Sequence, residues 1–464
     1  MIKPSRIPLL LIFLCLAFYG STQDAYQVNF RIRGLSDTVC LVANYYGNGT
    51  YVRDTLKVDA AGRCTFKAGA DLPRGIYILV INDKNYFDFI INNDKKFKIE
   101  TDRQKPMEKM TITSSPENSL FYKYLKYNKS QFDSIQTFQE KIKRFENQPD
   151  SVELLNSLIR AKNTALIQYK LELIKKHPSS FLAFLITTMK EPEVSNDSAF
   201  SYQDYTSRFW EGTDFSDDRL LRTPVFHNKL KKYFDQVLIQ QPDTLIREID
   251  NILGKAKPNQ EMFKYLIWFF TYHYESSDIM GFDRIFVDIV DKYYLTGEVT
   301  WLSKTMIENI IKKANRLRPI LIGQTAPNMI MQDTSYRLVS MMNIKAKYLI
   351  LLFWDPDCGH CENEIPILKT MYDEHKEEFG LEIFAVCSDT SLAKWKNIIR
   401  KKNLNWINVN GPRTLTGDYH EQYDIISTPV IYVLNERKEI IAKRLNADQL
   451  LRFLENHKKY QKKQ

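Results

Sequence analysis

Hydrophobic and polar positions follow three successive patterns along the chain. From about residue 26 to 100 apolar residues alternate with polar ones, as at Val28, Phe30 and Ile32, and short turns separate the alternating runs. Such alternation is typical of strands with one buried face. It predicts an N-terminal antiparallel β domain of β-sandwich type over residues 25–112.

The second pattern has helical spacing. Between about residues 116 and 317 apolar residues recur three or four positions apart, as at Ile285, Ile289 and Tyr293, and prolines interrupt the pattern at intervals. This spacing predicts an all-α middle domain of several helices over residues 113–317.

In the third pattern, strand-like and helix-like segments alternate. Residues 348–354 form a continuous apolar run, which a strand buried on both faces requires. The following residues predict helices at 365–379, 392–402 and 449–458 and strands at 381–386 and 430–434. This alternation predicts a C-terminal α/β domain over residues 318–464.

The first residues have the composition of a targeting segment. Residues 9–19 are almost wholly apolar and follow Lys3 and Arg6. Because the run is too short to span a bilayer, it predicts a secretory signal peptide over residues 1–22, with an uncleaved anchor as the alternative. The mature chain would then lie in the periplasm or cell envelope, where disulfides can form.

Composition narrows the function classes. The 464 residues include 65 Lys and Arg and 56 Asp and Glu, which gives a net charge of +9. That surplus is dilute, and no long basic stripe precedes the terminal cluster at 458–463, so we expect no nucleic-acid partner. Six cysteines are too few for a disulfide scaffold of this length, so their positions matter more than their number.

Residues 358–361, Cys-Gly-His-Cys, follow the predicted buried strand and begin a predicted helix. There the first thiol faces unpaired backbone N–H groups and the positive end of the helix dipole, which stabilise a thiolate. We therefore predict Cys358 as the nucleophile and Cys361, one turn deeper, as the resolving thiol. His360 between them is positioned to favour the thiolate electrostatically.

Other uses of paired cysteines are less well supported. A structural zinc site needs a second pair of ligands, and only Cys387 and scattered histidines are available. Covalent haem attachment needs histidine after the second cysteine, where Glu362 stands. We therefore expect no metal and no cofactor. An inert structural disulfide between Cys358 and Cys361 remains an alternative.

Residues from about 320 to 464 resemble the thioredoxin-like domain of envelope thiol-disulfide oxidoreductases of the TlpA/ResA type. The resemblance is carried by Gly323-Gln324-Thr325-Ala326-Pro327, by Phe353-Trp354 ahead of the Cys-Gly-His-Cys motif, by Pro366, and by Ser427-Thr428-Pro429 before a predicted strand. It implies redox exchange at Cys358 and Cys361.

The resemblance also implies further site residues. In this family the proline matching Pro429 is cis and lies against the disulfide, and the preceding backbone pairs with the substrate peptide. Thr428, Pro429 and Trp354 are therefore expected to bind substrate. Glu364 matches the family's active-site glutamate and is expected to take the proton of Cys361; a solvated residue in the first helical turns is the alternative.

Two departures from related patterns affect the redox chemistry. Cytoplasmic thioredoxins carry a buried aspartate where this chain has Leu352, so the proton acceptor would be Glu364 or water. Asp357 places a negative charge beside Cys358, which opposes the effect of His360, and the sequence leaves that contest open. A peroxiredoxin needs a Pro-x-x-x-Thr/Ser-x-x-Cys loop, and that spacing surrounds neither Cys358 nor Cys387.

The remaining cysteines have other expected roles. Cys15 leaves with the signal peptide, and Cys387 ends a predicted strand as a small buried apolar residue. Cys40 and Cys64 lie in separate predicted strands and are candidates for a structural disulfide, worth on the order of 3 kcal/mol. The alternation pattern does not decide whether these two side chains face each other.

These observations predict an exported thiol-disulfide oxidoreductase that exchanges its motif cysteines with protein thiols and disulfides of the envelope. An upstream electron donor or acceptor is a further expected partner, and peripheral membrane association remains open. The three-domain arrangement resembles multidomain envelope proteins of gut-type anaerobic bacteria, whose upstream domains imply no activity. The alternative is an envelope binding or scaffolding protein whose thioredoxin-like domain holds only a structural disulfide.

Overall fold

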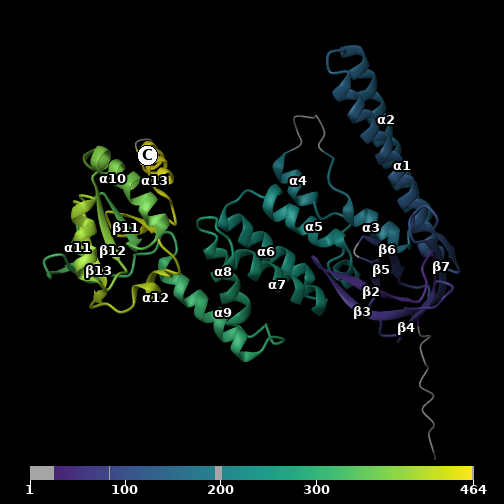
Figure 1. Cartoon of the computed structure of the whole chain (residues 1–464), viewed down its shortest axis with the longest axis horizontal. Helices are drawn as coiled ribbons and strands as arrows, with labels where there is room; N and C mark the ends of the chain where they lie inside the picture. Colours follow the sequence, from purple (N-terminus) through teal and green to yellow (C-terminus); the bar gives the residue numbers. More distant parts are fainter. Residues whose placement is uncertain (1–25, 83, 194–200, 462–464) are drawn as a thin grey trace, which may run out of the picture. The chain divides into compact units, whose positions relative to one another are not determined.

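A computed structural model describes residues 26–82, 84–193 and 201–461. The predicted signal peptide, including Cys15, lies outside these residues. The chain divides into two compact units, residues 1–237 and residues 238–464, each of which is described by itself (Figure 1).

The first unit begins with eight strands. They are β1 (Tyr26–Arg33), β2 (Thr38–Tyr46), β3 (Gly49–Val58), β4 (Arg63–Ala68), β5 (Gly75–Asn82), β6 (Asn85–Ile91), β7 (Lys96–Asp102) and β8 (Thr111–Thr113). They form two four-stranded sheets with the orders β4-β1-β7-β8 and β3-β2-β5-β6. Neighbouring strands run antiparallel except β1 and β7, which pair in parallel.

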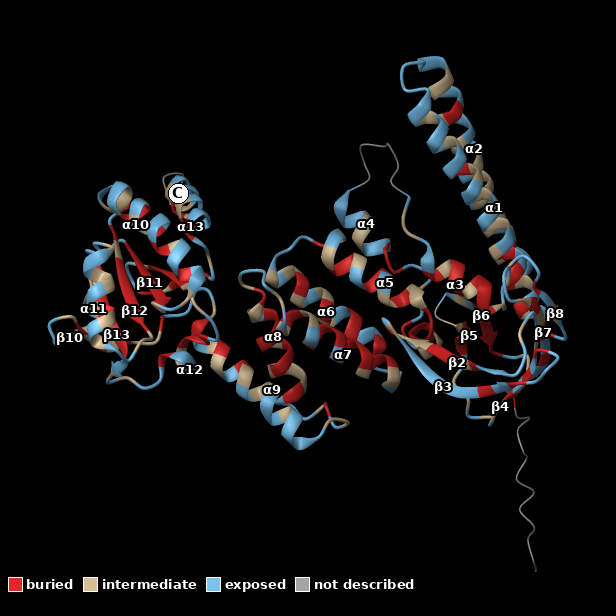
Figure 2. Cartoon of the chain, in the orientation of Figure 1, coloured by how far each residue is buried: buried red, intermediate tan, exposed pale blue. Residues whose placement is uncertain are grey.

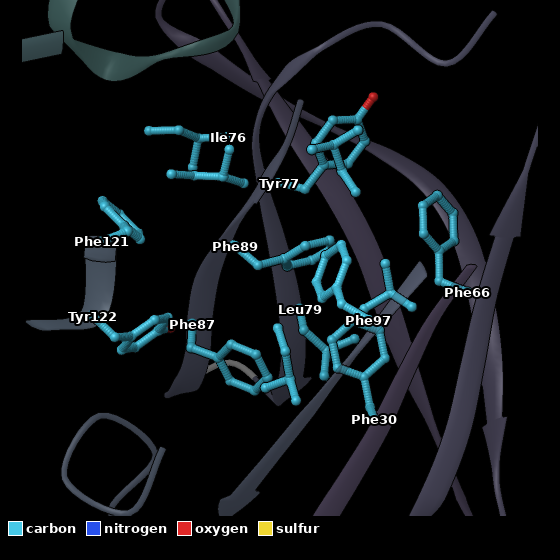
Figure 3. Packing of buried hydrophobic residues seen from close by; sticks show 14 of the residues in the cluster. Phe30, Phe66, Ile76, Tyr77, Leu79, Phe87, Phe89, Phe97, Phe121 and Tyr122 are labelled. Atoms are coloured by element: carbon cyan, nitrogen blue, oxygen red, sulfur yellow. The ribbon is translucent and has the colours of Figure 1, made fainter. Parts of the chain in front are cut away.

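Side chains from both sheets share one hydrophobic core (Figure 3). Along β1 every second residue is buried, because successive side chains of a strand point to opposite faces. The ring of Phe30 in β1 lies 5.4 Å from that of Phe89 in β6, and Phe66 in β4 lies 6.3 Å from Tyr77 in β5. These contacts join the two sheets and confirm the predicted N-terminal β fold.

Five α-helices follow among the described residues of the first unit. They are α1 (Pro116–Arg144), α2 (Pro149–Lys176), α3 (Phe181–Met189), α4 (Tyr202–Arg208) and α5 (Pro224–Lys232). Proline opens α1, α2 and α5, where its missing N–H leaves no helical hydrogen bond unmade. The buried Asn118 ties α1 to β6, because its amide accepts from the Ile90 N–H at 2.7 Å and donates to the Ile90 carbonyl at 2.9 Å.

The second unit opens with α6 (Pro242–Ala256), α7 (Gln260–Glu275), α8 (Asp283–Ile289) and α9 (Lys304–Leu317). The helical middle region is therefore as predicted, but the boundary between the compact units falls inside it, after Val237. Residues 276–282 connect α7 to α8 and are called the α7–α8 loop below. Gly281 in this loop has a φ of +88°, a conformation that favours glycine.

The rest of the second unit is an α/β domain. Its strands are β9 (Ile330–Asp333), β10 (Leu338–Ser340), β11 (Tyr348–Trp354), β12 (Leu381–Cys387), β13 (Ile407–Thr414), β14 (Val430–Asn435) and β15 (Ile440–Lys443). Its α-helices are α10 (Gly359–Phe379), α11 (Leu392–Lys401), α12 (Tyr419–Tyr423) and α13 (Ala447–Gln461). The seven strands form one sheet in the order β10-β9-β13-β12-β11-β14-β15.

All seven residues of the central strand β11 are buried, as the continuous apolar run predicts (Figure 2). β11, β12 and β13 run parallel, and β14 runs antiparallel to β11. β15 lies at the other edge of β14. Beyond β15, the segment 323–326 pairs with residues 438–440: the Gly323 N–H donates to the Ile440 carbonyl at 2.8 Å, and the Ala326 N–H donates to the Lys438 carbonyl at 2.9 Å. The C-terminal α/β fold is thus confirmed.

Candidate active site

The two motif cysteines lie where β11 passes into α10. Cys358 is the N-cap residue of α10, and its sulfur accepts a hydrogen bond from the backbone N–H of Cys361 at 3.4 Å. Cys358 is half-buried, whereas Cys361, one turn further along, is only 1% exposed. The first thiol is therefore open to a partner, and the second is covered.

The surroundings of the two sulfurs separate their acidities. Desolvation acts to raise the pKa of Cys358, but hydrogen bonds from the Thr428 side chain and from the backbone N–H groups of Cys361 and His360 leave it below its ordinary value. Burial raises the pKa of Cys361 to about 11. Cys358 is thus the thiol that more readily becomes a thiolate, the nucleophilic form.

The loop preceding β14 lies against the reactive sulfur. The Thr428–Pro429 peptide bond is cis, as the resemblance implies. The protonated Cys358 thiol donates a hydrogen bond to the Thr428 carbonyl oxygen at 3.1 Å. Thr428 and Pro429, two of the expected substrate-binding residues, therefore stand beside Cys358.

The charge of Asp357 has a partner that the sequence analysis missed. Lys394 of α11 forms an ion pair with the Asp357 carboxylate, and its Nζ also lies 3.6 Å from the Asp389 carboxylate. Lys394 therefore adds a positive charge to the balance between Asp357 and His360 that the sequence left open. Lys394 was missed because nothing in the linear sequence links α11 to the motif loop.

His360 is exposed in the first turn of α10. Its backbone N–H is one of the groups that lower the pKa of Cys358. Its side chain borders a groove beside the motif. The electrostatic role expected of the imidazole stays a prediction.

Glu364 is half-buried on α10 and joins two helices. Its Oε2 accepts a hydrogen bond from the backbone N–H of Ala447, the first residue of α13, at 2.9 Å. Glu364 and Cys361, both within the described ranges, share no direct hydrogen bond. The sequence analysis did not predict that Glu364 binds the first residue of α13. The role of Glu364 as the acceptor of the Cys361 proton stays a prediction.

Trp354 does not reach the surface. Its side chain is 1% exposed and belongs to the same core as Cys361 and Trp395. The expectation that Trp354 contacts substrate is therefore corrected: at the last position of β11 the side chain points into the core. Opposite Trp354 in the sheet is Cys387, which is fully buried, and burial raises its pKa to about 12.

Cys40 and Cys64 meet between the two N-terminal sheets. Both side chains are buried, on β2 and β4 respectively, and a hydrogen bond joins them. They therefore face each other, which the alternation pattern left undecided. The structure holds them as free thiols, and the structural disulfide stays a prediction.

A groove of about 790 Å³ runs alongside the motif. Its lining comes chiefly from α10, from the cis-proline loop, from the residues between β15 and α13, and from the α7–α8 loop. The members used below are His360, Glu364, Ile426, Pro429, Asp278 and Arg444. The groove gives a partner molecule access to the edge of the motif helix.

Across residues 26–82, 84–193 and 201–461, no group of three or more His, Cys, Asp or Glu side chains is arranged to hold a metal ion. In the same ranges no helix combines the length and apolar character needed to cross a bilayer.

Three family models match successive parts of the chain. Residues 322–443 match the AhpC/TSA family. Residues 26–121 match a domain of unknown function, DUF4369, and residues 159–316 match another, DUF5106. Two of the three matching models thus describe domains of unknown function.

Curated relatives match part of the chain. The thiol-disulfide oxidoreductase ResA of Bacillus cereus is 24% identical over 179 residues, which cover 38% of this chain and 96% of the relative. ResA of Bacillus subtilis is 26% identical over 121 residues, covering 26% of this chain and 64% of the relative. Among solved structures, a domain of a possible thiol-disulfide isomerase from Cytophaga hutchinsonii is 36% identical, with coverage of 31% of this chain and 97% of that one and a TM-score of 0.29.

Proposed function

We propose that this chain, which matches the AhpC/TSA family over residues 322–443 and is similar to ResA thiol-disulfide oxidoreductases, exchanges the Cys358–Cys361 dithiol or disulfide with cysteines of other proteins. The observation that carries this proposal is the contrast between the two thiols. Cys358 is accessible with a lowered pKa, and Cys361 is covered with a raised one.

In the reducing direction the Cys358 thiolate attacks one sulfur of a substrate disulfide. A bond forms between Cys358 and that sulfur, the substrate S–S bond breaks, and the released substrate thiolate takes a proton from water. Cys361 then loses its proton and attacks the Cys358 sulfur, which frees the second substrate thiolate. Two electrons have passed to the substrate, and the protein holds a Cys358–Cys361 disulfide.

The resolving step needs a base, because the pKa of Cys361 is about 11. We assign this role to Glu364, acting through water in the groove, since its carboxylate lines that groove on the same helix as Cys361. Thr428 and Pro429 supply the substrate-facing surface beside Cys358.

The proposed setting is the periplasm or cell envelope. Support comes from the apolar segment at residues 9–19 and the basic residues before it. The proposed partners are envelope proteins with exchangeable cysteines and a donor or acceptor that resets the motif. A compartment that permits disulfides suits such an exchange.

The test uses purified mature protein and a model protein disulfide. Wild type is expected to reduce it in the presence of a dithiol, and Cys358→Ser is expected to abolish the reaction. Cys361→Ser should accumulate mixed disulfides through Cys358, visible on non-reducing gels. Cys387→Ala is the matched control, since that buried thiol lies outside the motif and should leave activity unchanged. Equal activity of Cys358→Ser and wild type would sink the proposal.

A further inference from the structure

The groove beside the cysteines continues into a second cavity. This cavity, about 220 Å³, lies between the α7–α8 loop and the α/β domain, all within the second compact unit. Four residues line both spaces: Asp278, Asp424, Ile426 and Arg444. The surface next to Pro429 is therefore continuous with a loop of the helical region.

The C-terminal end of the α7–α8 loop is fixed to the α/β domain at Lys443. The Met280 sulfur accepts a hydrogen bond from the backbone N–H of Lys443 at 3.4 Å. Just beyond the loop, Asp283 forms an ion pair with Lys443, whose ammonium group also donates to the Ile320 carbonyl at 2.7 Å. The Lys443 side chain is 5% exposed, so this connection is buried.

On the side of the cavity formed by Asp424 and Arg444, ion pairs join the helical region to the α/β domain. The buried Asp424 forms ion pairs with Arg316 of α9 at 2.9 Å and with Arg444 at 3.0 Å. Because Asp424 is neutralised in this way, it offers no free charge to a ligand. The part of the helical region that borders the groove is therefore fixed to the α/β domain by buried contacts.

The side chains that this surface offers to a ligand are apolar or acidic. Ile426 is 81% exposed and stands three residues before Pro429, and Ile279 of the loop is 53% exposed. Asp278, the neighbour of Ile279 in the loop, lines both spaces and is exposed, and within residues 201–461 its carboxylate makes no hydrogen bond or ion pair. A ligand that covers this surface would gain from apolar side chains and from a positive charge.

We propose that the α7–α8 loop selects substrates for the cysteine motif. This inference rests on the proposed exchange with protein cysteines. The substrate is a polypeptide whose reactive cysteine sits at Cys358 while neighbouring residues extend over Ile426 towards the loop. Asp278 favours segments that carry lysine or arginine near the cysteine. Asp278 is thus a specificity-determining residue contributed by the helical region.

A polypeptide fits this surface better than a small thiol does. A small disulfide needs only the Cys358 sulfur and the adjoining loop, and it would leave Ile426 and Asp278 uncovered. An extended chain places side chains along the groove and meets both. The rates of peptide and small-molecule disulfides should therefore respond differently to changes at Asp278.

The test compares three substrates with the reduced full-length protein. Two are short peptides with one central cysteine, blocked as a mixed disulfide with mercaptoethanol and flanked by lysines in one and by glutamates in the other. The third is bis(2-hydroxyethyl) disulfide. Wild type should reduce the lysine peptide about two- to fivefold faster than the glutamate peptide, as one exposed charge contact allows. Raising the salt concentration should shrink that ratio.

Asp278→Asn should remove most of the preference, and Asp278→Lys should reverse it, with the rate on bis(2-hydroxyethyl) disulfide unchanged. Glu308→Lys, the same charge change at an exposed site on α9 outside both cavities, should keep the wild-type preference. An unchanged preference in Asp278→Lys, or equal effects on all three substrates, overturns the inference. Failure of wild type on every substrate would instead overturn the proposed function.

Discussion

The Glu364 carboxylate on α10 accepts a hydrogen bond from the backbone N–H of Ala447, the first residue of α13. One side chain thus caps a helix start and also borders the groove beside the cysteines. Its structural and chemical contributions can be separated, because glutamine can accept the same hydrogen bond but cannot take a proton at neutral pH.

Glu364→Gln is therefore expected to fold normally but to resolve mixed disulfides about 100-fold more slowly, the usual range for loss of a general base. Glu364→Ala should also lose about 1–3 kcal/mol of stability, because the Ala447 N–H is left without its acceptor. Quenched-flow detection of the mixed disulfide measures the first effect, and thermal unfolding measures the second. Equal resolution rates in wild type and Glu364→Gln would assign the proton to another base.

The acidity of Cys358 gives a pH dependence. Because its pKa lies below the ordinary thiol value, iodoacetamide should modify it with a half-maximal rate at a pH lower than that of a free cysteine. Thiolate hydrogen bonds stabilise the reduced fold above the unfolded-state pKa, and that contribution is lost as the pH falls through the folded-state pKa. Thr428→Val should move the half-maximal pH upward, while Cys361, with a pKa of about 11, should stay unmodified near pH 7.

The ion pair between Lys394 and Asp357 should also influence Cys358. Lys394→Ala leaves the Asp357 carboxylate without its counter-charge, so the pKa of Cys358 should rise. The double variant Asp357→Asn/Lys394→Ala should return it towards the wild-type value. Iodoacetamide titration reads this change directly. Lys401→Ala, at the far end of α11, is the matched control, and an equal shift in that variant would refute the local explanation.

The facing thiols of Cys40 and Cys64 make the predicted structural disulfide testable. If it forms after export, reduction should lower the free energy of unfolding of the N-terminal β region by about 3 kcal/mol. Cys40→Ala/Cys64→Ala should remove this response to reductant. Peptide mapping without reduction checks the bond itself, and recovery of both thiols unlinked from exported protein would contradict the prediction.

The fold was predictable where one physical requirement dominates the sequence. Residues 348–354 show this, because a strand covered on both faces must be apolar throughout, and β11 has these bounds. β13 was missed because Asn408 and Asn410 interrupt its apolar pattern. In the folded chain the Asn408 amide donates to the carbonyls of Leu404 and Trp406, and that of Asn410 donates to the Asp389 carbonyl.

At the candidate site, the cysteine motif could be recognised in the sequence. The residues that surround the motif are brought there by tertiary packing and could not be. The cysteine pair at a strand-to-helix junction follows from local order along the chain. The contacts of Lys394 with Asp357 and of Ala447 with Glu364 join segments far apart in sequence, so no local pattern could disclose them. The substrate contact expected of Trp354 was wrong for a related reason: Trp354 lies in one core with Cys361 and Trp395, which tertiary packing brings together.

The pairing of residues 323–326 with the chain around β15 has a consequence for the solubility of shortened chains. These residues form hydrogen bonds with backbone groups at the outer edge of the seven-stranded sheet. An unpaired edge is a template for strand addition by another molecule. A chain cut to begin at residue 328 would keep every strand of the sheet and both motif cysteines, yet it would expose that edge and be prone to edge-to-edge aggregation.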